Sequence, residues 1–127
     1  MLNHITIMGR LTRDPELRTT SAGVNVCDFT VAVNRRKTGD KQPETDFFRV
    51  SAWRQMGENC AKFLEKGRKV CVVGAVSVRT YQTNSGETRA SLEVVADDVE
   101  FLSPKDAPNP VDAESGMQIV HPDELPY

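Results

Sequence analysis

The sequence lacks any long apolar segment, and 39% of its 127 residues are hydrophobic. A membrane-spanning helix needs about 20 consecutive apolar residues, so we predict no membrane partner. The first nine residues also lack the basic start, apolar stretch and small-residue cleavage site of a secretion signal. We therefore expect a cytoplasmic protein, and the chain length favours a single ordinary domain.

Residues that would support catalysis or metal binding are also scarce. Cys27, Cys60 and Cys71 lie far apart and form no CxxC motif, so we interpret all three as small buried hydrophobic residues. The two histidines, His4 and His121, lie near opposite ends of the chain. No P-loop, HExxH or GxSxG motif is present. The sequence therefore predicts no enzyme, no metal site and no cofactor.

Charge is unevenly distributed along the chain. Residues 1–102 contain fifteen Lys and Arg against thirteen Asp and Glu, whereas residues 103–127 contain one Lys against five acidic residues. The second segment also carries Pro104, Pro108 and Pro110 among small polar residues, a composition typical of disorder. We therefore divide the chain into a mildly basic domain, 1–102, and a flexible acidic tail, 103–127.

Hydrophobic periodicity in the first segment predicts an all-β domain. Alternating apolar and β-branched residues indicate five strands, over 1–11, 24–34, 46–53, 69–79 and 89–101. Apolar residues at helical spacing indicate one helix over 55–65, carried by Met56, Cys60, Phe63 and Leu64. Gly67 is suited to end that helix, and Gly74 indicates a bulge in the fourth strand. This order fits the OB-fold, a five-stranded Greek-key barrel, with the helix between strands three and four.

Aromatic residues alternate with a cation on one face of the third predicted strand. Phe47, Arg49 and Trp53 share that face, while Phe48, Val50 and Ala52 lie on the other, which is apolar enough to form the core. A base that stacks on an aromatic ring gains about 1–3 kcal/mol whatever its identity, and cations beside the ring neutralise phosphates. The pattern therefore predicts a groove for single-stranded nucleic acid. The alternative, that Phe47 and Trp53 are core residues, remains open at this point.

Further candidate contacts lie near the ends of the predicted strands: Arg10, Arg35, Arg36, Lys37, Arg79 and Tyr81. Tyr81 would add a third ring for stacking. The basic run at 35–37 would form a mobile finger over a bound strand, and its alternative is an ordinary solvated loop.

The chain closes with an acidic and apolar peptide: Asp123, Glu124, Leu125, Pro126 and Tyr127. Such a peptide can dock its last ring in an apolar pocket while a basic rim holds its carboxylates. We therefore predict a protein-interaction tip, with an ordinary frayed terminus as the alternative.

Several motifs, in order and at consistent spacing, resemble the bacterial single-stranded DNA-binding proteins; they fall at 1–11, 14–18, 46–50, 63–67, 72–74 and 81–86. The resemblance covers about residues 1–102. It implies a homotetramer of OB-folds that wraps and protects single-stranded DNA without reading its sequence. It places Phe47, Trp53 and Tyr81 on base-stacking positions, and it implies that the tip recruits replication, recombination and repair enzymes at the nucleoid.

The chain departs from that family pattern in three places. Arg35, Arg36 and Lys37 stand where some members carry an aromatic residue, the tail is short, and the last residue is Tyr127 where the family normally ends in Pro-Phe. Two other functions stay open on the sequence: an OB-fold protein that binds RNA or assembles a primosome, and an enzyme such as a nuclease.

Overall fold

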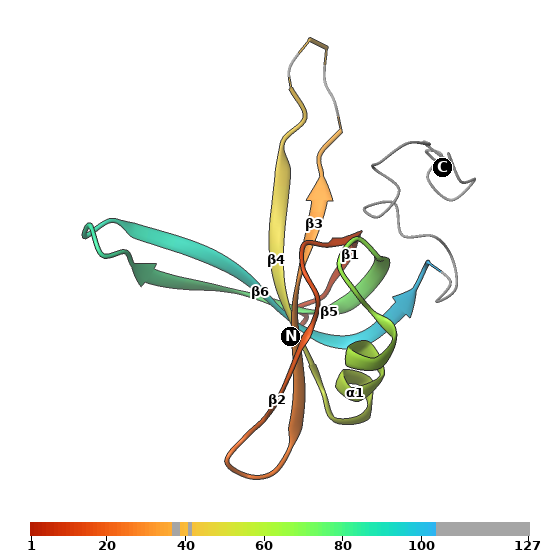
Figure 1. Ribbon diagram of the computed structural model, residues 1–127. Helices are drawn as coiled ribbons and strands as arrows, with labels where there is room; N and C mark the ends of the chain where they lie inside the picture. The colour runs from red at the N-terminus through yellow and green to blue at the C-terminus, as the bar shows by residue number, and fades with distance from the viewer. Residues whose placement is uncertain (37–38, 41, 104–127) are drawn as a thin grey trace.

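The computed structural model describes residues 1–36, 39–40 and 42–103, in which six strands and one helix follow one another (Figure 1). Their order is β1 (Ile5–Leu11), β2 (Glu16–Thr19), β3 (Asn25–Asn34), β4 (Thr45–Trp53), α1 (Arg54–Phe63), β5 (Lys69–Gln82) and β6 (Thr88–Phe101).

Five of the strands close into a barrel. The sheet runs β1-β5-β6-β4-β3, and β1 also pairs with β3, at Arg10 with Ala32 and Leu11 with Val31, which joins the two ends of the sheet. The pairing of β4 with β6 is parallel, and every other pairing is antiparallel. This confirms the predicted OB-fold, with the helix between the third and fourth strands of the barrel.

The remaining strand, β2, was not predicted. All four of its side chains are exposed, so residues 16–19 carry no alternation of buried and exposed positions. Backbone pairing with β3 holds the strand, with Leu17 opposite Cys27.

Strand β1 begins at Ile5 rather than at the predicted Met1. Before it, the Asn3 side chain forms hydrogen bonds with both the N–H and the C=O of Val76, in place of backbone strand pairing.

The core consists of the inward-facing positions of the barrel strands. Its fully buried valines come from four strands: Val31, Val50, Val70, Val72 and Val94. The predicted bulge is confirmed, since the register between β5 and β6 shifts between Val73 and Gly74. A Cβ atom at Gly74 would lie 2.1 Å from the Val95 carbonyl oxygen, so only glycine allows the two strands to approach this closely.

The helix packs against β3 and β4 and closes one end of the barrel. It spans residues 54–63 rather than the predicted 55–65, because Leu64 turns to an extended conformation and inserts into the core. Gly67 does adopt a left-handed conformation, but three residues beyond that point. Cys60 is buried as expected, whereas Phe63 is 36% exposed and lies against Phe101.

The cysteines divide into two groups. Cys27 and Cys60 are buried, as predicted, and burial raises the pKa of the Cys27 thiol to about 11 and that of Cys60 to about 12. Cys71 is only half-buried, so its prediction as a buried residue was wrong. It sits on β5 opposite Met8, whose side chain is itself 45% exposed at the barrel surface.

Candidate nucleic-acid interface

The two faces of β4 differ in burial, although Phe48 on the predicted inward face is only half-buried, not buried as expected. Val50 and Ala52 are completely enclosed by the barrel. Phe47 is 57% exposed and Trp53 is 40% exposed, and Arg49 between them is also exposed. The alternative that both rings belong to the core is therefore excluded.

Strand pairing extends this outward face across the neighbouring strands. Arg49 lies opposite Glu93 of β6, and Glu93 lies opposite Ser77 of β5. Because side chains alternate along a strand, Arg79 and Tyr81 share the face of Ser77. Tyr81 is 47% exposed, on the hairpin of β5 and β6 that projects from the barrel at the left of Figure 1. We call the surface formed by Phe47, Arg49, Trp53, Arg79 and Tyr81 the aromatic face.

The cations of the aromatic face differ in their partners. Within the described part of the chain, Arg49 forms no ion pair or hydrogen bond. The Arg79 guanidinium lies 3.9 Å from the Glu93 carboxylate, a long contact between a largely exposed side chain and a half-buried one. Arg49 is thus the cation of this face that is most available to a phosphate.

The other predicted cations are Arg10 and the basic run at 35–37. Arg10 is half-buried and donates a 3.0 Å hydrogen bond to the Gly67 carbonyl, so it links the end of β1 to the loop before β5. Arg36 is exposed. Lys37 and the whole predicted tip, residues 123–127, lie outside the described residues.

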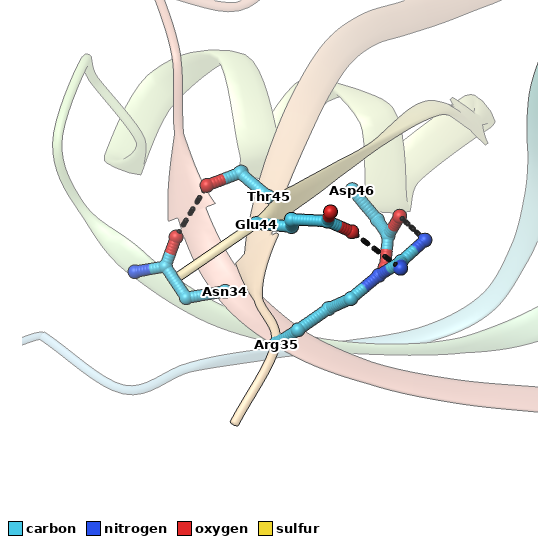
Figure 2. A network of polar contacts seen from close by, with 5 residues as sticks. All are labelled: Asn34, Arg35, Glu44, Thr45 and Asp46. Atoms are coloured by element: carbon cyan, nitrogen blue, oxygen red, sulfur yellow. Dashed lines mark hydrogen bonds and ion pairs between the residues drawn. The ribbon is translucent and has the colours of Figure 1, made fainter. Parts of the chain in front are cut away.

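Arg35 lies in a network of polar contacts at the base of the β3–β4 hairpin (Figure 2). Its guanidinium donates from Nε and Nη2 to the two oxygens of Asp46, at 2.9 Å each, and from Nη1 to Glu44 at 2.7 Å. The hydrogen bond from Arg35 lowers the pKa of the Asp46 carboxyl. One cation here faces two carboxylates, so Arg35 adds no net positive charge to the surface.

The structure also reveals two exposed arginines that sequence patterns did not single out. Arg54 directly follows Trp53 and has a φ of 59°, a left-handed conformation that costs a residue with a side chain about 1–2 kcal/mol. Arg13 and Arg49 both line a cleft of about 330 Å³. In the described ranges neither Arg13 nor Arg54 has an ion-pair or hydrogen-bond partner. The fold brings Arg13 to Arg49, whereas Arg54 is next to Trp53 in the chain itself.

The cleft between Arg13 and Arg49 is mixed in charge. Asp28 on its wall pairs with Arg18 and accepts a 3.0 Å hydrogen bond from the Ser51 hydroxyl. Asp14 accepts from the backbone N–H of Lys66 at 2.8 Å. Among the described residues, no cluster of three or more His, Cys, Asp or Glu could hold a metal ion. Asp14 and Asp28 are therefore occupied by contacts within the protein.

None of the helices in the described ranges has the length and apolar character needed to cross a membrane.

Known proteins resemble this chain over the region that forms the barrel. Residues 2–102 match the profile of the single-strand binding protein family. A single-stranded DNA-binding protein of Staphylococcus aureus is 45% identical over 108 residues, which cover 84% of this chain and 69% of that protein. Single-stranded DNA-binding protein 2 of Listeria monocytogenes is 47% identical over 106 residues, 83% of this chain and 66% of the relative. A Caldanaerobacter subterraneus relative of the same name is 47% identical, with 83% and 71% covered.

These matches span about two thirds of the length of the relatives, and the family profile covers all of the described barrel strands. The closed five-stranded fold, the outward aromatic residues and the profile match agree with one another. The chain belongs to the single-strand binding protein family.

Proposed function

We propose that this chain binds and protects single-stranded DNA, without sequence preference, along the aromatic face. Phe47, Trp53 and Tyr81 would stack on bases, and Arg49 would neutralise phosphates with help from Arg79. The observation that carries this proposal is the exposure of Phe47 and Trp53 on a strand whose other face already fills the core. Large apolar rings that remain in contact with water indicate a binding surface.

The cations that surround the rings complete the proposal. Arg13, which lines the same cleft as Arg49, and Arg54, which follows Trp53, would add positive charge, as would Arg36 and Lys37 of the basic run at 35–37. Such contacts release counterions from the DNA, so affinity should fall as salt rises. Arg10 and Arg35, whose guanidinium groups already bond protein oxygens, would support the surface rather than hold phosphates.

Titration of Trp53 fluorescence tests the proposal, because Trp53 is the sole tryptophan of the chain. Oligothymidylate should quench the emission, with an affinity that falls steeply with salt. An equal or greater affinity for an RNA oligomer of the same length would favour the RNA-binding alternative. The proposal also states that the chain is not an enzyme, so labelled DNA should remain intact with magnesium.

We further propose a homotetramer that acts in cytoplasmic replication, recombination and repair. Large apolar side chains away from the aromatic face support an assembly, since Met8 is 45% exposed and Leu17 is 48% exposed. Sedimentation with and without an oligonucleotide would give the number of subunits. A monomer at micromolar concentration would contradict this part of the proposal.

The tip would recruit partner enzymes, which follows from its acidic residues and its final ring. Deletion of residues 103–127 should leave DNA affinity unchanged or higher, because the deleted segment carries an excess of four negative charges. A large loss of affinity would show that the tail itself contributes to DNA binding.

A further inference from the structure

Phe47 lies where the β3–β4 hairpin leaves the barrel. Strand β4 pairs with β6 only from Phe48 to Ser51, so Phe47 and the residues before it are paired with β3 alone. A two-stranded hairpin is only marginally stable in water. The position of the Phe47 ring therefore depends on what else holds the two strands of the stem together.

Polar side chains hold this stem on both of its faces (Figure 2). On the face of Phe47, the Thr45 hydroxyl donates a 2.8 Å hydrogen bond to the Asn34 side chain. On the opposite face, Arg35 spans both oxygens of Asp46, the residue directly before Phe47. A backbone hydrogen bond of 2.8 Å from Arg35 to Glu44 extends the strand pairing one step further.

The Arg35 guanidinium is occupied in a way that disfavours phosphate. A two-pronged contact between arginine and a carboxylate is among the strongest and most directional of charged hydrogen bonds. With Glu44 as a second acceptor, a phosphate near Arg35 would meet two negative charges against one positive. Strand alternation also places Arg35 on the face opposite Phe47 and Arg49.

From this geometry we infer that Arg35 is a positioning residue, which fixes Phe47 for base stacking by clamping Asp46, and that it does not hold DNA phosphate. The inference rests on the proposed binding of single-stranded DNA along the aromatic face. Arg35 would thus assist DNA binding by orienting Phe47 and not by attracting the negatively charged DNA backbone.

Arg35→Gln and Arg49→Gln form a matched pair for the test. Each removes one cation, and the two cations lie on opposite faces of the β3–β4 hairpin. Oligothymidylate affinity should be measured for both from low to high salt. Arg35→Gln should weaken binding about two- to fivefold, the range for exposed ion pairs of good geometry, with an unchanged salt slope. Arg49→Gln should reduce the slope of log affinity against log salt by about 0.7. Equal loss of slope in both variants would overturn the inference.

Asp46→Asn gives the sharpest contrast, because the two roles for Arg35 predict opposite signs. If Arg35 bound phosphate, removal of the neighbouring carboxylate would release the cation and tighten DNA binding. As a positioning residue, Arg35 needs Asp46, so Asp46→Asn should weaken binding about as much as Arg35→Gln does. Tighter binding by Asp46→Asn would refute the clamp.

Coupling to Phe47 separates positioning from a general loss of structure. In a Phe47→Ala background, Arg35→Gln should have no further effect on affinity, since the ring that it orients is gone. Additive effects of the two substitutions would contradict the inference. Thermal unfolding should show each variant folded. If the unaltered chain fails to bind oligothymidylate, the proposed function is wrong. If the chain binds but the two substitutions have additive effects, only the role of Arg35 is wrong.

Discussion

The two faces of β4 have opposite surroundings, although their residues alternate along one nine-residue strand. Val50 and Ala52 make contact only with protein, while Phe47 and Trp53 keep about half of their surface in water. The difference shows that the barrel does not need the outward rings for its core. Folding and DNA binding should therefore respond to different substitutions in the same strand.

The largest expected effect is on folding, at the point where β4 passes into the helix. A Cβ atom at Gly57 would lie 2.2 Å from the Ala52 carbonyl oxygen, and backbone on both sides prevents relief. Gly57→Ala should therefore lower the free energy of unfolding by about 3 kcal/mol or more. For a domain of this size, the thermal midpoint should fall by more than about 10 °C.

Gly23→Ala is the matched control, because no atom lies within 4 Å of a Cβ placed there and the only cost is its left-handed φ of 83°. It should cost about 1–2 kcal/mol. A similar loss for both glycines would show that close packing of the helix on β4 does not determine stability.

The fold and the face of the rings could be predicted because both follow from periodicity. Alternation along β4 is a local property, and it places Phe47 and Trp53 on one face; that this face is the outer one follows from their exposure in the structure. The bulge followed from a single residue, Gly74. Strand β2 could not be predicted because all four of its side chains are exposed, so its sequence has no alternation of apolar and polar residues that would indicate pairing with β3.

The partners of the cations could not be predicted, because they depend on register. Arg35 meets Glu44 and Asp46 nine and eleven residues away, a pairing that exists only in one alignment of the hairpin. In the sequence it is simply the first member of a basic run. The left-handed backbone of Arg54 has no sequence signal either, since a residue with a side chain rarely adopts it.

The second prediction concerns the outward face. Trp53→Ala should weaken binding of oligothymidylate by about 1–3 kcal/mol, or about five- to 150-fold, through loss of one stacking ring. Its thermal midpoint should change by only a few degrees because the ring is 40% exposed. As the substitution removes the fluorophore, filter binding or anisotropy of labelled DNA is the measurement. Unfolding of the variant would show that Trp53 serves the core after all.

The third prediction is the converse, on the inward face. Val50→Ala removes methyl groups from a side chain that is 1% exposed, and should cost about 2 kcal/mol of stability through lost burial and a residual cavity. DNA affinity at 25 °C should be unchanged for the folded fraction. Denaturant unfolding followed by titration would check both values. A loss of affinity comparable with that of Trp53→Ala would mean that the two faces are coupled.

The smallest effect is expected at Arg79, where the hairpin of β5 and β6 differs from the clamped stem of β3 and β4. The Arg79 side chain is 71% exposed, and its contact with Glu93 is long at 3.9 Å. DNA must compete with that carboxylate, so Arg79→Gln should weaken binding about twofold or less and reduce the salt slope by less than Arg49→Gln does. A salt titration of both variants decides the order. If the salt slope fell more for Arg79→Gln, the DNA phosphates would lie along the hairpin of β5 and β6. The bound DNA would then not follow β4 across the aromatic face.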